Sequence, residues 1–511
     1  MLVAALAAAG VATAVPSEKA ADSARVGGSK ELRNAVEPAG ILVHERRLQR
    51  IANANDGTRS SGTPGYKASA DYVAGKLERA GYRVKRQTFE FPFFQEISSS
   101  FSQTEPDQRD FEPYDISTNT GDYAVMTYSG SGVVEDVAVV PTNDVQIPPP
   151  AEPGSTSGCE ASDFPAEVSG NVALIQRGTC TFQQKAQNAE AAGAVAAIIF
   201  NEGQEGRTDV VLGTLGEPGI GIPVLGVSFA LGQDLFKASG PRVSMDIQTA
   251  SENRATQNII ADTRTGRADR TVVVGAHLDS VLEGPGINDN GSGSATILET
   301  ALQMDKLNFE PRNRVRFAFW GAEEFGLLGS DYYVNNISDR KLDNIALNLN
   351  FDMLGSPNYV RFVYDGDGSD TELKGPAGSA QIEDVFNNYF TSRGLETDPT
   401  AFDGRSDYGP FIEQGIPAGG LFSGAEGVKT PEQEDIYGGT SGVAYDECYH
   451  QACDDISNLS IESLDEMSDA VAHATRTYAK QKNLFVSSDD RLGARSSGKV
   501  YDKFKGPEAR K

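Results

Sequence analysis

Between about residue 257 and residue 352 the chain alternates short apolar runs with helical patterns, and this alternation limits the possible folds more than any other feature. The runs at 271–276, 314–320 and 345–352 are predicted strands, and helical patterns cover 294–304 and 326–335. Nearly continuous apolar strands that alternate with helices are typical of a parallel sheet with both faces covered. We therefore expect an α/β fold built on a mostly parallel, doubly wound sheet.

Polar side chains follow each predicted strand at the point where it ends. In such a sheet the carboxyl ends of the strands gather the reactive groups. A tight turn before the first helix and a short segment far downstream add further polar groups. The candidates are, in chain order, His277, Asp279, Asp289, Glu323, Glu324, Asp352, Tyr449 and His450. Any one of them alone is more often an ordinary loop or core residue, so the prediction depends on the whole set.

This set has the chemistry of a zinc site, because it combines two imidazoles with several carboxylates and contains no thiolate. Two Zn²⁺ ions would be balanced by the carboxylates of Asp289, Glu324 and Asp352 together with a hydroxide, and a neutral site can be buried. Glu323 is then left free as a general base. The chain has four histidines. We expect the remaining two, His44 and His473, to be ordinary helix residues.

Composition narrows the possible partners and the location. The net charge of −27 argues against a general nucleic-acid binder, which needs a basic surface. The apolar stretch 2–15 is shorter than the roughly 20 residues of a membrane-spanning helix. It ends in Ala12-Thr13-Ala14, small residues typical of a secretory cleavage site. We therefore expect a secreted protein with a signal peptide at 1–14, a disordered leader or propeptide at 15–38 and a basic tail at 486–511.

The chain contains four cysteines. An even, small number in an exported chain suggests two structural disulfides. Local pairing is the simplest of the three possible connectivities, and it joins Cys159 to Cys180 and Cys448 to Cys453.

The motifs that carry the candidate residues resemble peptidase family M28, the di-zinc aminopeptidases, and the Streptomyces-type secreted leucine aminopeptidases look most similar. The resemblance rests on five motifs in the same order. They are His277-Leu278-Asp279-Ser280, the turn 286–293, Gly321-Ala322-Glu323-Glu324, Asn350-Phe351-Asp352-Met353 and Cys448-Tyr449-His450.

The resemblance implies a role for each matched position. Asp289 would bridge two zinc ions, His277 and Asp352 would complete one of them, and Glu324 and His450 the other. Glu323 would take a proton from the bridging water and pass it to the leaving amine. Tyr449 would donate to the developing oxyanion, and Asp279 would orient His277. Both histidines must be neutral to bind metal, so we expect activity to rise between pH 6 and pH 8.

A further resemblance concerns the substrate pocket. Gly404 and Phe422 would be apolar walls, Arg405 a polar contact, and Glu323 with Asp352 would hold the free α-amine. The alternative interpretation makes Arg405 a salt-bridge partner and Phe422 a core residue. The compact relatives also bind calcium. Asp465 and Asp469 match two of its ligands, but Ala35 and Val36, near which the third is expected, lack a carboxylate.

The segment 118–252 resembles a protease-associated (PA) domain through the motifs at 158–164 and 170–182. Such domains are non-catalytic and can restrict access to the peptidase cleft. The expected organisation is therefore an N-terminal part of the peptidase domain at 39–117, the insertion at 118–252 and the remaining peptidase domain at 253–485.

These expectations add up to a monomeric aminopeptidase that releases neutral or apolar residues such as Leu from peptides with a free N-terminus. The alternatives are a glutaminyl cyclase on the same fold, which would hold one zinc, and a carboxypeptidase, which would need a basic pocket. A third alternative is a non-catalytic binding protein that works through its PA-like segment. No G-x-S-x-G motif is present, so a serine hydrolase is not supported.

Overall fold

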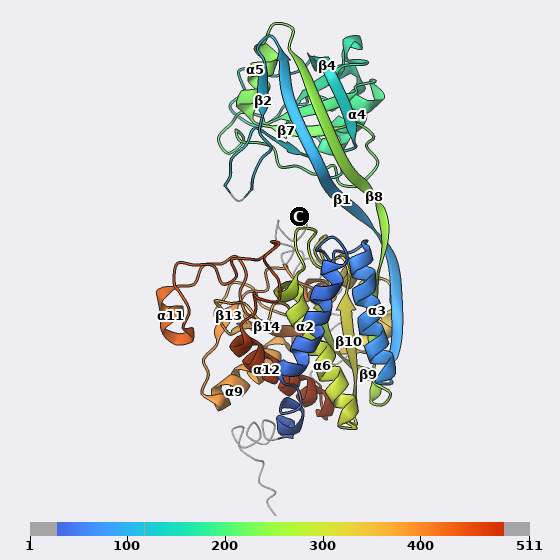
Figure 1. Ribbon diagram of the computed structural model, residues 1–511, viewed down its shortest axis with the longest axis vertical. Helices are drawn as coiled ribbons and strands as arrows, with labels where there is room; N and C mark the ends of the chain where they lie inside the picture. Colours follow the sequence, from blue (N-terminus) through green and yellow to red (C-terminus); the bar gives the residue numbers. More distant parts are fainter. Residues whose placement is uncertain (1–27, 117, 485–511) are drawn as a thin grey trace, which may run out of the picture. The chain divides into compact units, whose positions relative to one another are not determined.

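Two long strands, β1 (Arg83–Glu105) and β8 (Arg242–Asp262), each begin in one compact unit of the protein and end in the other (Figure 1). The computed structural model describes residues 28–116 and 118–484. The first unit comprises the chain up to Phe89 and again from Thr256 onward, and the second unit is Glu90–Ala255. The predicted signal peptide and basic tail lie outside the described residues.

The first unit is built on a mixed, largely parallel sheet. Its central strands are β11 (Ile345–Phe351), β9 (Arg267–His277) and β10 (Asn313–Trp320), and both neighbours pair with β9 in parallel. On one side β11 pairs in parallel with β14 (Ala418–Phe422), which pairs antiparallel with β12 (Phe362–Tyr364), and β12 pairs with β13 (Asp398–Thr400). On the other side β10 pairs antiparallel with β8.

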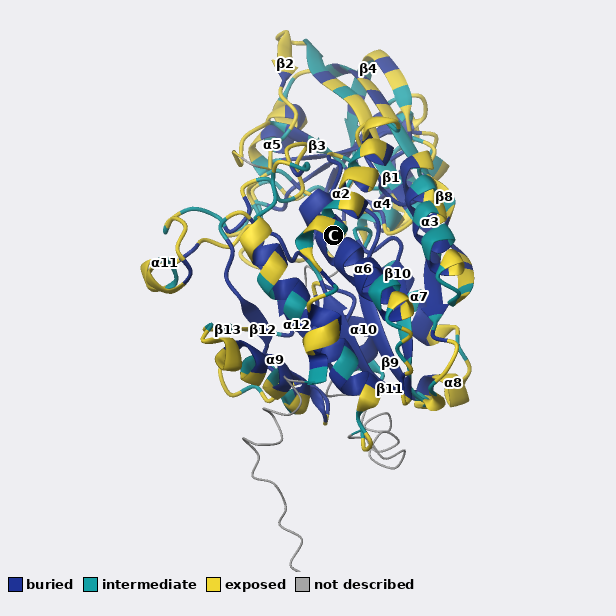
Figure 2. Cartoon of the chain, turned by 60° about the horizontal axis from the view of Figure 1, so that its bottom comes forward, coloured by how far each residue is buried: buried dark blue, intermediate teal, exposed yellow. Residues whose placement is uncertain are grey.

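Helices cover both faces of this sheet, as the doubly wound pattern predicts. One face packs against α2 (Pro38–Asn53), α3 (Pro64–Arg79), α6 (Gly293–Lys306), α9 (Ser379–Arg393) and α12 (Ile461–Lys480). The other packs against α7 (Leu328–Asn335), α8 (Asp339–Asp343) and α10 (Gly409–Glu413). Figure 2 shows the result: the central strands are buried. The first turns of α12 alternate buried and exposed residues, whereas residues 470–475 of this helix are all buried. The expected fold class is confirmed.

The N-terminal segment corrects one expectation. We expected residues 15–38 to be a disordered leader, but residues 28–33 are helical. Leu32 and Val36 are buried in the main core, and Arg33 pairs with Asp469 on α12 at 3.0 Å. Residues 28–38 are therefore part of the first unit. Leu32 and Val36, four positions apart, pack into a core formed by distant segments, which the local sequence pattern does not show.

The second unit begins earlier than the boundary we expected at 118. Strand β1 continues without a break past Phe89, and its Phe101 stacks on Phe111 of β2 (Arg109–Phe111) at 4.6 Å between ring centroids. Residues 90–117, expected in the peptidase domain, thus belong to the second unit. The polar composition of 95–130 hides this boundary, because the buried aromatic residues within it are widely spaced.

The core of the second unit is a short parallel sheet with a helix on each side. Strands β4 (Gly132–Pro141), β5 (Val172–Gln176), β6 (Ala196–Phe200) and β7 (Val224–Val227) pair in parallel, and β3 (Tyr123–Val125) and β8 complete the edges in antiparallel pairing. Helices α4 (Phe182–Ala191) and α5 (Phe229–Lys237) pack against β6. Two short 3₁₀ helices, Ala161–Asp163 and Ala166–Val168, precede β5.

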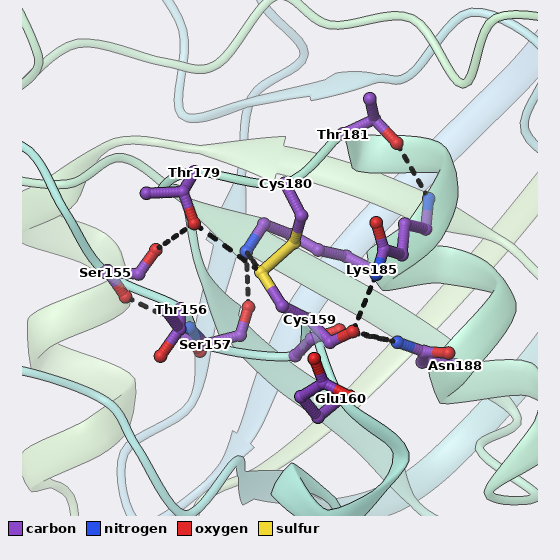
Figure 3. Close-up of a disulfide and its surroundings, with 12 residues drawn as sticks. Ser155, Thr156, Ser157, Cys159, Glu160, Thr179, Cys180, Thr181, Lys185 and Asn188 are labelled. Atoms are coloured by element: carbon purple, nitrogen blue, oxygen red, sulfur yellow. Dashed lines mark hydrogen bonds between the residues drawn. A yellow bond between two sulfur atoms is a disulfide. The ribbon is translucent and has the colours of Figure 1, made fainter.

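Both disulfides have the local pairing that was the simplest of the possibilities, Cys159 with Cys180 and Cys448 with Cys453. Figure 3 shows the first one beside the start of α4. The Lys185 ammonium donates to the carbonyl of Ser157, and Asn188 Nδ2 donates to the carbonyl of Cys159 at 2.9 Å. These bonds attach the disulfide loop to the helix.

No helix in the described ranges 28–116 and 118–484 has the length and apolar character needed to cross a lipid bilayer.

Candidate active site and metal centre

The register of the parallel strands brings the predicted residues together. Trp320 pairs with His277 and Asn350 with Gly275, so three strands end side by side and Glu323, Glu324 and Asp352 follow at that edge. The turn η3 (Ile287–Ser292), which contains Asp289, lies between β9 and α6. The disulfide loop with His450 reaches the same place, since its imidazole contacts Asp289.

His277, Asp289 and Asp352 form one group of metal-type ligands. His277 Nε2 lies 3.1 Å from Asp352 Oδ1 and 3.2 Å from Asp289 Oδ1. Glu323 Oε2 lies farther out, 3.9 Å from the same nitrogen. The imidazole of His277 is buried, only 1% exposed.

Asp289, Glu324 and His450 form a second group next to the first. His450 Nε2 lies 3.2 Å from Asp289 Oδ2 and 3.1 Å from Glu324 Oε2. The two oxygens of the Asp289 carboxylate thus face different histidines, which is the arrangement that a carboxylate bridging two ions requires.

The electrostatics of the protein without metal are those of a site built for cations. Burial by itself lowers the pKa of His450, but the carboxylates of Glu324 and Asp289 outweigh it and raise that pKa to about 11. The pKa of His277 is also raised despite burial, by Asp352 and Glu323. Burial and Asp289 raise the pKa of Glu324 to about 7. In the metal-free protein, protons on the two imidazoles therefore balance the negative charge of the neighbouring carboxylates.

The residues fit two zinc ions. Each group offers one imidazole nitrogen and carboxylate oxygens within 4.8 Å of one another, and these are ligand types that zinc takes. Glu324 Oε1 is buried and accepts no hydrogen bond within the described part of the chain. A buried carboxylate oxygen without a partner is costly, and a cation at this place would satisfy it.

Zinc binding to the metal-free protein at neutral pH is expected to release about one proton for each histidine and part of a proton from Glu324, because zinc takes the unprotonated imidazole and the ionised carboxylate. Since the raised pKa values keep both imidazoles protonated at neutral pH, zinc affinity should rise with pH throughout the range below about 11. Calorimetry in buffers of different ionisation enthalpy measures the proton release. His450→Gln should release about one proton fewer, and an affinity that does not change between pH 6 and pH 8 would contradict the assignment.

Neighbouring side chains hold the candidate ligands. His277 Nδ1 lies 3.2 Å from the backbone carbonyl of Asp279 and 3.7 Å from its Oδ1. Asp279 Oδ1 also accepts from the backbone N–H of Glu323 at 3.3 Å, so Asp279 contacts both His277 and the segment with the expected base. Ser406 Oγ donates to Asp352 Oδ2 at 2.6 Å. Ser406 was not predicted, although it stands in the same short motif as Arg405.

Arg59 is a second residue that the sequence analysis missed. Its guanidinium is fully buried and donates to the carbonyls of Leu278, Pro285 and Gly286, with 2.8 Å for the bond to Pro285. These carbonyls belong to the loop between β9 and η3, so Arg59 holds the connection between His277 and Asp289. No local signal distinguishes it within the turn-rich segment 56–65.

A cavity of about 340 Å³ opens on the two metal groups. Its wall contains Phe422, Arg405, Tyr449 and the base candidate Glu323, as expected. Gly404 is not part of the wall, because its backbone N–H turns to the hydroxyl of Tyr408 at 2.9 Å. The residues that the sequence did not predict are Gly326, Leu327, Met353, Tyr364, Thr400, Ala401, Asp403, Ser406, Ala425 and Glu426.

Arg405 is a salt-bridge partner and also lines the cavity. Its guanidinium pairs with Glu426 at 2.6 Å and also lies 3.4 Å from the hydroxyl of Tyr449. Burial raises the pKa of the Tyr449 phenol well above its usual value, so the phenol stays protonated and can donate. Phe422 faces the cavity and stacks on Phe362 with 5.8 Å between ring centroids.

The other predicted positions lie in the helical layer. His44 contacts Tyr72 and Glu299 at 2.6 and 3.0 Å, and His473 Nδ1 contacts Ser29 at 2.8 Å. Asp469 accepts from Arg33 and Tyr389, each at 3.0 Å. The guanidinium of Arg33 thus contacts a carboxylate that was matched to calcium.

Comparison with known proteins agrees with this geometry. The profile described as "Peptidase family M28" matches residues 258–475, and the profile "PA domain" matches residues 139–235. An aminopeptidase of Pseudomonas aeruginosa is 45% identical over 449 residues, which cover 87% of this chain and 81% of that protein. Leucine aminopeptidase 2 of Trichophyton rubrum is 37% identical and covers 93% and 91%.

A solved structure leads to the same family. BSAP, a zinc aminopeptidase from Bacillus subtilis, aligns with a TM-score of 0.56 and 26% identity over 89% of this chain and 98% of that one. The ordered motifs, the strand-end site and these likenesses have one common explanation. The chain belongs to peptidase family M28, carries an inserted PA domain, and is a peptide hydrolase.

Proposed function

We propose that the protein is a di-zinc aminopeptidase that releases neutral, preferably apolar residues such as Leu from peptides with a free N-terminus. The observation that carries the proposal is the Asp289 carboxylate, whose two oxygens lie 3.2 Å from His277 and 3.2 Å from His450. The names of the relatives, aminopeptidase and leucine aminopeptidase, support it.

In the proposal His277, Asp289 and Asp352 would hold one ion, and Asp289, Glu324 and His450 would hold the other. Zinc, when bound, would lower the pKa of a water at the site and polarise the substrate carbonyl. Asp279 and Ser406 orient His277 and Asp352, since each of them contacts one of these ligands.

Glu323 is the proposed general base and acid. Burial raises the pKa of Glu323 well above its usual value in the protein without metal, and a carboxyl group with a raised pKa is suited to moving protons near neutral pH. Its carboxylate accepts a proton from the attacking water and gives it to the amine of the departing peptide. Glu323 stays outside the proposed ligand set, because the neighbouring Glu324 is the residue that contacts His450.

Tyr449 and Arg405 are proposed to act on the carbonyl oxygen. The protonated phenol of Tyr449 donates a hydrogen bond as negative charge develops, and Arg405 lies close enough to its hydroxyl to favour that orientation. Such a donor typically contributes about 10²–10³ in rate.

The shape and charge of the cavity support an N-terminal substrate. Glu323 and Asp352 both line it and would hold the positively charged α-amine, while Leu327, Met353 and Phe422 present apolar surface to the first side chain. The charge of Arg405 is already balanced by its pair with Glu426, which disfavours binding of a substrate carboxylate and therefore carboxypeptidase action.

The deciding experiment compares leucine para-nitroanilide with its N-acetylated form and counts the zinc. Two zinc ions per chain are expected, with hydrolysis of the free-amine substrate about 10⁴-fold faster, because a site built for a polar group rejects an analogue that cannot pair with it. One tightly held zinc and cyclisation of an N-terminal Gln would support a cyclase instead. Absence of any turnover by the zinc-loaded protein would favour a binding protein.

The remaining expectations are part of the same proposal. Two formed disulfides support export to an oxidising compartment, and we propose a secreted monomer. We leave calcium out of the proposal, because Arg33 and Tyr389 already engage Asp469.

A further inference from the structure

One buried carboxylate outside the proposed ligand set holds the turn that contains the bridging residue. The side chain of Asp454 accepts two successive backbone N–H groups, that of Asn288 at 2.8 Å and that of Asp289 at 3.0 Å, one on each oxygen. The backbone N–H of Ile287 donates to the carbonyl of Asp454 at 3.0 Å. Three consecutive residues of η3 thus donate hydrogen bonds to Asp454, which is 1% exposed.

Asp454 is also tied to His450 through covalent bonds. It directly follows Cys453, whose disulfide with Cys448 closes a loop with a sequence separation of 5. His450 lies inside this loop with φ = 57°, in the left-handed region that side chains other than glycine rarely adopt. The loop therefore determines where the imidazole lies, and Asp454 determines where the loop lies relative to Asp289.

The two metal groups are consequently held together by different means. The distance between His277 and Asp352 follows from the strands β9 and β11, which pair directly in the sheet. The distance between Asp289 and His450 instead depends on how the turn η3 lies against the disulfide loop. The hydrogen bonds of Asp454 join these two segments.

Two neighbours strengthen the connection. Asn458 Nδ2 donates to Asp454 Oδ1 at 3.2 Å and to Asp446 Oδ1 at 2.9 Å. Asp446 Oδ2 accepts from the side-chain amide of Asn288 at 2.6 Å. The backbone and the side chain of Asn288 are thus hydrogen-bonded to Asp454 and Asp446, the residues that flank the disulfide loop.

From this arrangement we infer that Asp454 is a positioning residue mainly for one metal position, the one formed by Asp289, Glu324 and His450, because it fixes the loop of His450 relative to Asp289, whereas His277 and Asp352 are held by the sheet. The inference rests on the proposed function, because it presumes two zinc ions. Hydrogen-bonding partners behind metal ligands commonly change metal affinity by about 10- to 100-fold when they are removed.

The test is a titration of the metal-free full-length chain with Zn²⁺ against a competing chelator. Asp454→Asn keeps the size of the side chain but turns an NH₂ group toward a backbone N–H that needs an acceptor. We expect the variant to bind one zinc as tightly as the wild type and the second about 10- to 100-fold more weakly. Adding His450→Ala to the variant should leave the tight site unchanged.

Glu202→Gln is the matched control. It is the same acid-to-amide change at a buried carboxylate that also accepts two successive backbone N–H groups, those of Gly154 at 2.7 Å and Ser155 at 2.8 Å, but in the second unit. Both zinc affinities of this variant should equal those of the wild type. The melting temperature of each metal-free variant shows whether it is folded, and if Asp454→Asn is not, Asn458→Ser takes its place with the same selective weakening expected.

Two results would overturn the inference while leaving the proposed function intact. They are wild-type affinity at both positions in the variant, and equal weakening at both positions. A wild-type protein that binds fewer than two zinc ions would instead overturn the two-metal proposal, and the inference with it.

Discussion

Glu323→Gln is expected to lower kcat by about 10²- to 10⁴-fold while both zinc ions stay bound. Glutamine has nearly the same shape as glutamate but cannot accept the proton of the attacking water. Because Glu323 Oε2 lies 3.9 Å from His277 Nε2, outside the closer ligand contacts, the metal site should survive the change. Metal analysis of the purified variant, together with its kcat on leucine para-nitroanilide, measures both effects.

The adjacent residue supplies the control for this prediction. Glu324→Gln makes the same chemical change one position later, where the carboxylate contacts His450 at 3.1 Å. This variant should lose zinc, whereas Glu323→Gln should not. If Glu323→Gln turned over as fast as the wild type, Glu323 would not be the base.

Asp289→Asn is expected to have an even broader effect, because it weakens both metal positions at once. The carboxylate supplies one oxygen to each histidine group, and His277 and His450 in turn lower the pKa of Asp289 although burial raises it. The neutral amide offers a single acceptor oxygen. We expect zinc content to fall from two ions to one or none, with activity lower by at least about 10²-fold, the upper end of what loss of an outer partner costs.

Zinc content after dialysis and activity across added zinc test this prediction. Excess zinc should restore little activity, since the bridge itself is missing. A variant that kept two tightly bound ions would show that Asp289 does not bridge. His473→Gln is a suitable comparison, since His473 contacts Ser29 and stacks on Tyr389 of the helical layer, and it should keep both ions.

The sequence was sufficient for the parts of the protein that local pattern controls. Apolar strands that alternate with helices predict the doubly wound sheet, and polar residues directly after three of those strands must meet once the strands lie parallel. Cysteines close in sequence predict their own pairing. Candidate ligands could be named because few types of side chain bind zinc and the chain has only four histidines.

Other features depend on contacts between distant segments, and only the tertiary structure decided them. Arg33 and Leu32 join the first unit through partners on α12 and in the main core. Arg59 and Asp454 are an ordinary arginine and an ordinary aspartate in turn-rich stretches. They matter because folding buries them against the backbone of the loop that follows His277 and of the turn that contains Asp289. A buried hydrogen bond depends on both of its partners, and the sequence does not show which two distant residues folding will bring together.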